Sequence, residues 1–457
     1  MKNNPNIIII VLDTLRRDVL PNYNGNAITP NIEAFSKESV VFKNPIAPSP
    51  WTVPSHMSLF TGLYPGEHNV REDLDTGDKK ALDKIYAYGG KTIVEKMREK
   101  GYNTLGFSTN PWLSPNTGFD RWFNSFTFFS SEYMSPDEIA AVDDYKKYGK
   151  NRRKAAVNLA LKGNFKELLR YYNIHKRILK RKEEVEYPYR KGADLIVNTI
   201  MNSSFEEPFF IFINFMEVHE PVSRWELDRD DRIIKYMDIT NNSPIPKKLM
   251  EQTKNDYKRS LTMADLEIGK LIKHLKSSKL YENSLIIVTS DHGQAMKEPY
   301  QYPYYGHGNF LYNEIIEVPM IMKFPGNIKI DQKEGYQNLT GIYKILENAA
   351  DNEFQDSITE PVSFSESFGP VHDLEGLVKN GILPAELDYK DLINKMFYPK
   401  KAVYKNNYKL VINGSGGKVD EFTFKGKQIE VKDKQEIFND LVNELSIFKG
   451  TERFTLP

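Results

Sequence analysis

The 457-residue sequence contains no cysteine. This absence excludes disulfide bonds, thiolate metal sites and a catalytic thiol. An excess of charge of one sign is also lacking, because 62 Lys and Arg residues balance 62 Asp and Glu residues. A neutral chain presents no overall positive field to a polyanion, so we expect no nucleic-acid partner.

Long hydrophobic runs are missing as well. The apolar run Ile7–Leu12 near the N-terminus is too short for the core of a secretion signal or for a membrane span. No stretch elsewhere has 18 consecutive apolar residues. These features favour a cytoplasmic location.

Apolar strand-like runs alternate with helical patterns along most of the chain. Ile7–Leu12, Pro208–Phe215 and Ser284–Thr289 are continuous apolar runs, typical of strands that are buried on both faces. Such alternation predicts an α/β fold with a doubly wound, mainly parallel sheet sandwiched by helices. Further strands are expected at Val40–Phe42, Asn103–Thr109 and Val318–Phe324, and helices at Thr29–Lys37, Lys91–Lys100 and Lys254–Ser277.

Two regions depart from this alternation and define the expected domain organisation. Residues 1–394 are expected to form the main catalytic domain, with a helical insertion at about 129–200. From about residue 395 to 457 the chain has short alternating segments, such as Ala402–Ile412, and a last helical piece near Asn439–Phe448. This pattern predicts a small C-terminal subdomain with an antiparallel sheet and a helix.

The insertion is strongly basic. Between Lys146 and Lys191 there are 16 Lys or Arg residues and four Glu residues. Such a segment is suited to peripheral contact with an anionic surface, which could be a polyanion, lipid headgroups or an anionic glycan. The alternative is an exposed helical lid whose charges are only solvated.

The stretch from Ala47 to Gly66 places a hydroxyl residue at the expected start of a helix. Thr52 precedes Pro54 by two positions, and Gly62 is expected to end the helix. Free N–H groups and the positive end of the helix dipole favour an oxyanion at such a position. Thr52 is therefore a candidate nucleophile, although it could equally be an ordinary helix cap.

Acidic and histidine residues follow the expected strands at their carboxyl ends. Asp13, His219, Asp291 and His292 stand there, and ligands of doubly wound sheets gather at that edge. Asp13, Asp291, His292 and the Thr52 hydroxyl form a mixed oxygen and nitrogen set, which suits Zn²⁺ or Mn²⁺ better than Ca²⁺ or Mg²⁺. The set predicts a site for one or two divalent metal ions, which would lower the pKa of the Thr52 hydroxyl. Taken one by one, these residues could instead be caps or structural histidines.

These motifs, in this order, resemble the sulfatase family of the alkaline phosphatase superfamily. The run TVPSH from Thr52, followed by MSLFTG, is similar to the family's nucleophile motif, in which Cys or Ser precedes x-Pro-x-Arg. VLDTLRRD and TSDHG resemble its two metal-ligand strands, and FMEVHEP stands in place of the commoner Asp-Pro-His-x-Pro. KAVYKNNYKLVIN resembles part of its C-terminal subdomain.

The resemblance implies roles for individual residues. It makes Asp13, Asp291 and His292 metal ligands and Thr52 the nucleophile. His219 and His307 would hold the ester oxygens, protonate the leaving group or bind a second metal. The remaining candidates are His56, a possible catalytic residue at the position of the motif's Arg, and two possible substrate contacts, Asn110 and Arg16.

The nucleophile position also bears on the reaction. Classical sulfatases oxidise Cys or Ser to formylglycine, an aldehyde that a threonine cannot form, and members that keep a threonine generally act on phosphoesters. The resemblance therefore predicts a metal-dependent hydrolase that cleaves a phosphoester or phosphodiester through a covalent Thr52 intermediate. Its substrate would be a small molecule, a glycan or a lipid headgroup. The alternatives are a sulfuric ester hydrolase, a transferase that moves phosphoglycerol or phosphoethanolamine onto a glycan, and a degenerate anion-binding protein.

Overall fold

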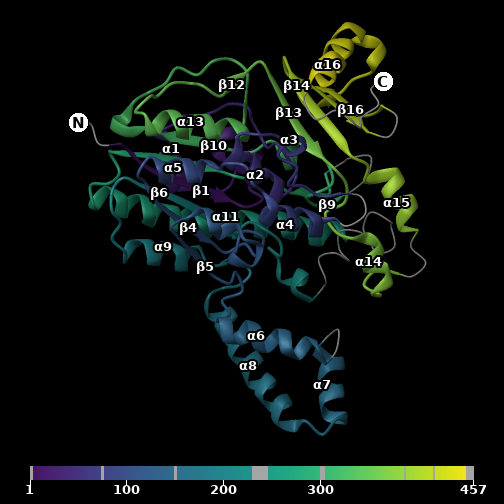
Figure 1. Ribbon diagram of the computed structural model, residues 1–457. Coiled ribbons are helices and arrows are strands. Elements are labelled where there is room, and N and C mark those ends of the chain that lie inside the picture. Colours follow the sequence, from purple (N-terminus) through teal and green to yellow (C-terminus); the bar gives the residue numbers. More distant parts are fainter. Residues whose placement is uncertain are drawn as a thin grey trace.

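A seven-stranded sheet forms the centre of the computed structural model, which describes residues 4–73, 77–148, 152–228, 245–298, 304–384, 388–414 and 417–448. Figure 1 shows this sheet with its helices. In the order in which they lie across the sheet, the strands are β2 (Val40–Val41), β10 (Met320–Lys323), β7 (Ser284–Thr289), β1 (Asn6–Leu12), β6 (Phe209–Phe215), β4 (Asn103–Ser108) and β5 (Ser125–Phe128).

The sheet is mainly parallel, which confirms the predicted fold class. β1 pairs in parallel with β6 and β7, and β4 pairs in parallel with β6 and β5. The exception is β10, which runs antiparallel to both β7 and β2. Parallel strands need crossovers that cover both faces, and the complete burial of β1 and β6 agrees with this requirement.

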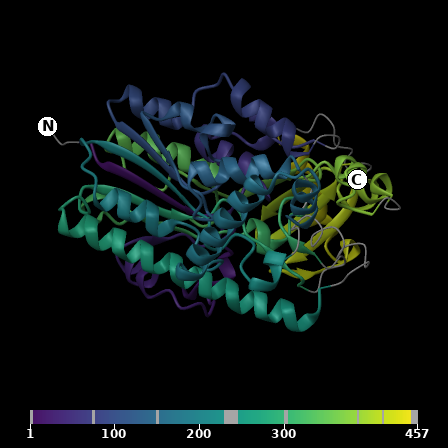
Figure 2. The ribbon, with the colours of Figure 1, turned by 90° about the horizontal axis from the view of Figure 1, so that it is seen from below.

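Alternate side chains of β1 enter two separate hydrophobic cores, because successive residues of a strand point to opposite faces. Ile7, Ile9 and Val11 belong to the core on one face, and Ile8 and Ile10 to the core on the other. The sheet lies between two helical layers (Figure 2). The first core includes helices α2 (Thr52–Thr61), α5 (Ile93–Glu99) and α13 (Ile342–Ala350), and the second includes α1 (Pro30–Lys37), α9 (Ala193–Met201) and α11 (Lys247–Ser277).

The predicted helices of the main domain are present, with shifted ends. α5 starts after Thr92, whose hydroxyl accepts a hydrogen bond from the Glu95 N–H while the Glu95 carboxylate accepts one from the Thr92 N–H. This reciprocal capping explains the start of α5 inside the predicted range. α11 begins seven residues earlier than predicted, directly after Pro246, which is its N-cap. The other short elements of the main body are α3 (Pro65–His68), α4 (Asp78–Ala87), α12 (Asn313–Ile316), α14 (Leu374–Lys379), α15 (Tyr389–Met396), β3 (Pro45–Ile46), β8 (Ala295–Met296), β9 (Tyr305–Gly306), β11 (Tyr336–Asn338) and β12 (Thr359–Glu360).

A second, antiparallel sheet lies near the C-terminus, as predicted. Its strands lie in the order β13 (Val362–Ser367), β14 (Lys400–Lys405), β15 (Tyr408–Asn413), β16 (Lys418–Phe424) and β17 (Lys427–Gln428), and α16 (Gln435–Ile447) packs on it. β13 precedes the boundary expected at residue 395. The segment expected as one unit at 402–412 is a hairpin, because Asn406 and Asn407 both have positive φ and form its two-residue turn.

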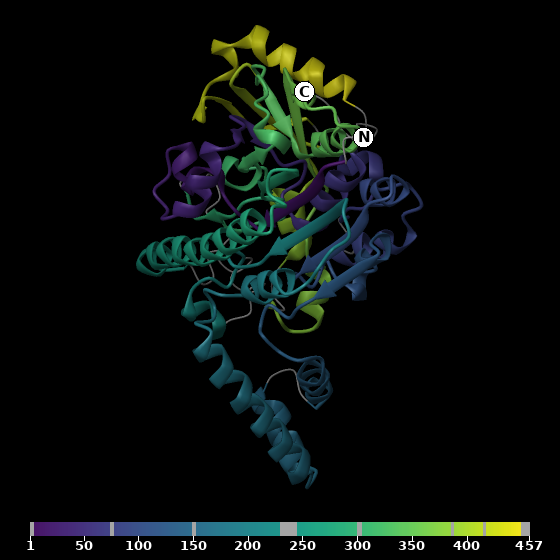
Figure 3. The ribbon, with the colours of Figure 1, turned by 90° about the vertical axis from the view of Figure 1, so that its left-hand side faces the viewer.

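The basic insertion contains three helices that project from the main body (Figures 1 and 3). They are α6 (Pro136–Lys146), α7 (Arg152–Leu161) and α8 (Phe165–Glu184), and we call this unit the arm. The last part of the expected insertion range differs, because α9 packs on the central sheet together with α11. No helix among the described residues combines the length and the apolar character needed to cross a bilayer.

Candidate active site

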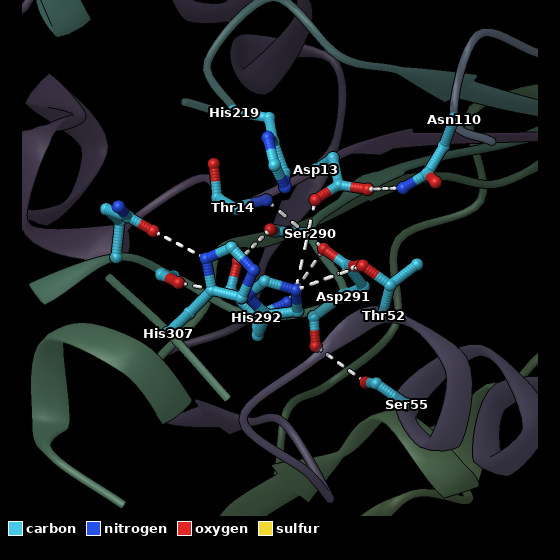
Figure 4. A network of polar contacts seen from close by, with 12 residues as sticks. Asp13, Thr14, Thr52, Ser55, Asn110, His219, Ser290, Asp291, His292 and His307 are labelled. Atoms are coloured by element: carbon cyan, nitrogen blue, oxygen red, sulfur yellow. Dashed lines mark hydrogen bonds and ion pairs between the residues drawn. The ribbon is translucent and has the colours of Figure 1, made fainter. Parts of the chain in front are cut away.

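The carboxyl ends of β1, β4, β6 and β7 meet the start of α2, and this meeting point collects the predicted site residues (Figure 4). Asp13 follows β1, Asn110 follows β4 and Asp291 follows β7. The parallel order of these strands brings their ends to one edge of the sheet, as the sequence predicts for Asp13, His219, Asp291 and His292.

Thr52 is the first residue of α2 and is almost fully buried. The N-cap is Trp51, and no side chain forms a capping hydrogen bond at this helix start. Instead, Thr52 Oγ1 lies 3.4 Å from Nε2 of His292. The hydroxyl therefore faces the candidate metal ligands at the positive end of a helix.

Asp13, Asp291 and His292 form a cluster that could hold a metal ion. One ligand atom from each lies within 4.8 Å of the others, and His292 Nε2 is 3.8 Å from Asp13 Oδ1 and 3.4 Å from Asp291 Oδ2. Asp13 Oδ1 and Asp291 Oδ2 are buried and accept no hydrogen bond from the described residues. Two converging buried carboxylate oxygens without donors fit a cation well.

The other atoms of this cluster are held in place by hydrogen bonds. Asn110 Nδ2 donates to Asp13 Oδ2 at 2.6 Å, and the backbone N–H groups of Thr14 and His292 donate to Asp291 Oδ1. His292 Nδ1 lies 2.9 Å from the Gly293 carbonyl, so Nδ1 carries the proton and Nε2 faces the cluster. These contacts orient the ligand atoms toward one point.

The electrostatics of the metal-free cluster reflect its burial. Burial, together with the neighbouring Asp291 carboxylate, raises the pKa of Asp13 to about 6. Burial also raises the pKa of Asp291 to about 7 and lowers that of His292 to about 4. Both carboxylates are thus costly to ionise without a nearby positive charge, which a divalent cation would supply.

A second cluster lies beside the first and contains His219, Glu220 and His307. Glu220 Oε2 is 3.3 Å from His307 Nδ1, and the ring centroids of His292 and His307 are 4.5 Å apart. His219 Nδ1 is 2.6 Å from the Glu220 carbonyl, and His307 Nδ1 is 2.7 Å from Gln294 Oε1. Since both partners are acceptors, Nδ1 carries the proton in each ring, which leaves Nε2 as the basic nitrogen.

His56 lies one turn after Thr52 and is fully buried beneath the site. Its Nδ1 is 2.9 Å from the Thr52 carbonyl and 3.5 Å from Asp291 Oδ2, and its ring packs edge-on against Phe119 and Phe212. Burial lowers the pKa of His56 to about 3, so the ring is neutral at ordinary pH. The geometry suits support of the helix start better than contact with a charged ester.

Thr14, which follows Asp13, has a strained backbone. Its φ is 61°, a left-handed value that costs a β-branched residue roughly 1–3 kcal/mol. Three hydrogen bonds hold it there: its N–H donates to Asp291, its hydroxyl donates to the Val218 carbonyl, and the Tyr257 hydroxyl donates to its carbonyl. The strain keeps Asp13 aimed at Asp291 and His292.

The two predicted substrate contacts have other partners in the structure. The Asn110 amide is used on both sides, because its Nδ2 donates to Asp13 and its Oδ1 accepts from the Trp112 N–H. The Arg16 guanidinium pairs with Asp18 and Glu298 and donates to the Gln294 carbonyl. Substrate contact by these residues remains a prediction, and the observed geometry favours supporting roles.

Glu220 and Lys191 belong to the site but were not singled out in the sequence. The position of Glu220 directly after His219 could have indicated it as a ligand. Lys191 was hidden among the basic residues of the insertion, yet it is buried, and its Nζ donates to the carbonyls of Glu217 and His219. Burial lowers the pKa of Lys191 to about 8. No local signal in the sequence distinguishes it from its exposed neighbours.

The family model for sulfatases matches residues 5–347, which is most of the chain and includes every site residue described above. The chain belongs to the sulfatase family. A relative from Formosa agariphila, an ulvan-active sulfatase, is 26% identical over 342 residues, which cover 72% of this chain and 58% of that protein. The chain thus spans less than two thirds of the length of that curated relative.

Solved structures support the fold. A 2-O GAG sulfatase superposes with a TM-score of 0.63 at 15% identity and covers 99% of this chain and 95% of its own. The phosphonate monoester hydrolase of Agrobacterium radiobacter also superposes with a TM-score of 0.63, at 14% identity, covering 97% of this chain and 94% of its own. At these identities the likeness shows a shared fold.

Proposed function

We propose that this sulfatase-family hydrolase is metal-dependent and cleaves a phosphoester or phosphodiester through a covalent bond to Thr52. The observation that carries the proposal is the place of Thr52 Oγ1, buried at the start of α2 and 3.4 Å from His292 Nε2. A threonine cannot supply the aldehyde of a formylglycine. Its oxygen can attack phosphorus directly, and a phosphothreonine can later be released by water.

The first cluster fits a divalent cation, with Asp13, Asp291, His292 and Thr52 as the residues that would hold it. The mixed donor set favours Zn²⁺ or Mn²⁺ over Ca²⁺ or Mg²⁺. A bound ion of this kind lowers the pKa of a coordinated hydroxyl and neutralises charge on ester oxygens. His219, Glu220 and His307 could hold a second ion by the same reasoning.

In the proposed reaction, Thr52 is the nucleophile and a histidine transfers protons. Nε2 of His219 or His307 takes the proton of the Thr52 hydroxyl, and Oγ1 forms a bond to phosphorus while the bond from phosphorus to the departing alcohol oxygen breaks. The same nitrogen then gives that proton to the departing oxygen. In the second step this nitrogen takes a proton from a water molecule whose oxygen bonds to phosphorus, the bond between phosphorus and Oγ1 breaks, and the proton passes to Oγ1, which restores Thr52. Throughout, the N–H groups at the start of α2 stabilise the equatorial oxygens.

A phosphate ester fits this site better than a sulfate ester on chemical grounds. A phosphate monoester can carry two negative charges where a sulfate ester carries one, so the cation and the helix start bind it more strongly. The structural neighbour that hydrolyses phosphonate monoesters has a similar fold. The substrate class we propose is a small-molecule or glycan ester.

Hydrolysis of a sulfuric ester is the second candidate. The observation in its favour is that matched relatives are named as sulfatases, including the ulvan-active enzyme and an N-acetylglucosamine-6-O-sulfatase from Bacteroides thetaiotaomicron. In that case Thr52 would serve as an unmodified nucleophile toward sulfur.

The test compares wild type with Thr52→Ala on an aryl phosphate, an aryl phosphodiester and an aryl sulfate, after metal removal and reloading with Mn²⁺ or Zn²⁺. We expect wild type to hydrolyse one of the phosphorus esters and Thr52→Ala to lose roughly 10³-fold or more in kcat. Thr61→Ala is the matched control, because Thr61 lies on the same helix and its hydroxyl bonds to the Met57 carbonyl and the Leu63 N–H, away from the site.

Three outcomes are informative. Turnover of the sulfate ester alone would select the second candidate. Undiminished turnover by Thr52→Ala would remove the covalent Thr52 step. Metal loading without turnover of any ester would point to an anion-binding protein.

A further inference from the structure

The arm has a small core of its own and a defined root. Tyr145, Ala155 and Leu159 are buried together between its helices, and Ile174 and Ile178 of α8 are also buried. At the root, Arg181 pairs with Glu138 at 2.7 Å and donates to the Tyr133 carbonyl, so α8 is tied to the start of α6. The inward face of α8 is therefore occupied within the protein.

The outward face of α8 carries a row of exposed apolar side chains. Phe165, Leu169, Tyr172 and Leu179 are 66%, 61%, 62% and 51% exposed, and we call them the apolar stripe. Their spacing of four, three and seven residues places them on one side of the helix, over a length of about 21 Å. Leu161, at the end of α7 next to the turn into α8, is 80% exposed. Exposed apolar side chains gathered on one side of a helix mark an interaction surface.

A row of positive charge runs directly beside the apolar stripe. Lys166, Arg170, Arg177 and Lys180 are exposed. Lys166, Arg170 and Lys180 each follow a residue of the apolar stripe by one position, and Arg177 follows Lys176, an exposed lysine that lies in the row of the stripe between Tyr172 and Leu179. We call these four residues the basic stripe. Between Phe165 and Lys180 the only acidic residue is Glu167. The outward face thus offers apolar contact and positive charge side by side.

We propose that the arm docks on the surface of a lipid bilayer with anionic headgroups, with α8 lying in the plane of the interface. In this arrangement the apolar stripe enters the boundary between headgroups and acyl chains, and the basic stripe pairs with the headgroups. Tyr172 has the amphipathic ring that is favoured at this depth. The arm projects away from the main body, so the helices of the central sheet do not cover α8 (Figures 1 and 3).

Other occupants match this face less well. If the outward face of α8 paired with the same face of a second copy, the two basic stripes would repel each other. A soluble polyanion would neutralise the basic stripe but would leave the apolar stripe in water. Only an anionic surface with an apolar interior satisfies both stripes.

The test is sedimentation of the full chain with vesicles of phosphatidylcholine alone or of phosphatidylcholine mixed with phosphatidylglycerol. We expect binding to the anionic vesicles and little binding to the neutral ones, with a fall at high salt. The triple variant Lys166→Gln, Arg170→Gln and Arg177→Gln is expected to bind roughly 100-fold more weakly. Phe165→Ser with Leu169→Ser is expected to lose roughly tenfold or more, because it removes exposed apolar side chains.

Matched controls separate the role of the two stripes from the effect of a changed net charge and from the loss of any exposed apolar side chain. Lys247, Lys248 and Lys273 are exposed on α11, so their triple change to Gln alters the net charge equally, away from the arm. Ile447→Ser removes an apolar side chain that is 75% exposed on α16. Both controls are expected to bind like wild type, and all substituted positions are exposed, so folding is not at risk.

Several results would overturn the proposal. These are absence of sedimentation with either vesicle, equal binding to neutral and anionic vesicles, and loss of binding in the α11 control. A dimer in solution that Phe165→Ser with Leu169→Ser dissociates would assign the apolar stripe to a second copy instead. Binding to a soluble polyanion such as heparin, without binding to vesicles, would also overturn it. None of these readouts depends on the esterase proposal.

Discussion

The ammonium group of Lys191 lies 3.0 Å from the carbonyl oxygen of Glu217, and the same nitrogen donates to the carbonyl of His219. The contact is reciprocal, since the backbone N–H groups of Lys191 and Ala193 donate to Glu217 Oε1. Lys191 is thus bonded to the backbone at Glu217 and at His219, the two ends of a three-residue segment. Because it follows the arm in the chain, it also joins the base of the arm to the site.

Lys191→Met is expected to lower turnover about 10- to 100-fold, as is usual when a residue that orients a functional side chain is lost. It should also lower the free energy of unfolding by about 1–3 kcal/mol, because two buried carbonyls lose their donor. The measurement is kcat and KM per folded protein, with urea unfolding in parallel. Lys323→Met is the control: Lys323 is buried and donates to the carbonyls of Tyr281, Glu282 and Ser284, away from the site. A loss of turnover that is equal in both variants would reduce Lys191 to a structural residue.

Asn110→Ala is expected to weaken metal binding about 10- to 100-fold, since Asp13 loses the donor that orients it. Titration of the metal-free protein with Mn²⁺ measures the change. Asn338→Ala serves as the control, because Asn338 is also buried and donates to Ser363 and Phe364 in the C-terminal sheet. Unchanged affinity with altered KM would assign Asn110 to the substrate instead.

Metal removal is expected to lower the melting temperature at pH 8, because an ion that binds only the folded state stabilises it by about 4 kcal/mol at a thousand times its Kd. The stabilisation should fade as the pH drops below about 6. Protons compete with the ion for Asp13 and Asp291, whose pKa values are raised to about 6 and about 7. Asp291→Asn should abolish the response. Asp265→Asn, at a buried carboxylate that accepts from Asn31 and Ile32, should keep it. Equal metal responses in the two variants would contradict the site.

His68 gives a separate dependence of stability on pH. Its Nε2 lies 3.0 Å from the Ser58 hydroxyl and 3.2 Å from the Pro54 carbonyl, and burial lowers its pKa to about 3. The unfolded chain, with a pKa near 6.5, binds a proton first, so this contribution is present above that pKa and is lost as the pH falls. Between pH 7.5 and 5 the stability advantage of wild type over His68→Gln should shrink by about 2 kcal/mol, as measured by urea unfolding. A constant difference would show that folding leaves the pKa of His68 unchanged.

Much of the fold is predictable because strands that are buried on both faces have mostly apolar sequences. Ile7–Leu12 is apolar throughout and Ser284–Thr289 is apolar between its first and last residues, and their observed strands differ from the prediction by at most one residue. The direction of β10 is not predictable in this way, because Met320–Lys323 has the same apolar character in a parallel or an antiparallel position. Strand direction depends on the path of the chain between elements.

Some residues of the site are predictable from the sequence and others are not, for the same reason. Asp13, Asp291 and His292 follow recognisable strands, so the shared edge of the sheet brings them together. The partners of Asn110 and Lys191 depend on residues distant in the sequence, and side-chain direction at the end of a strand has no periodic signal. The exposed apolar stripe is not predictable from the sequence, because helical spacing alone does not show which face of α8 is covered.

The hydroxyl of Ser55 donates to the carbonyl of Asp291 at 2.6 Å, and both groups are buried. This bond joins the first turn of α2 to the loop after β7, so the gap between the Thr52 oxygen and the carboxylates is set by the packing of the protein. Discrimination among cations at such a site follows from ionic radius: an ion of the wrong size must either leave a ligand out of reach or break a buried bond.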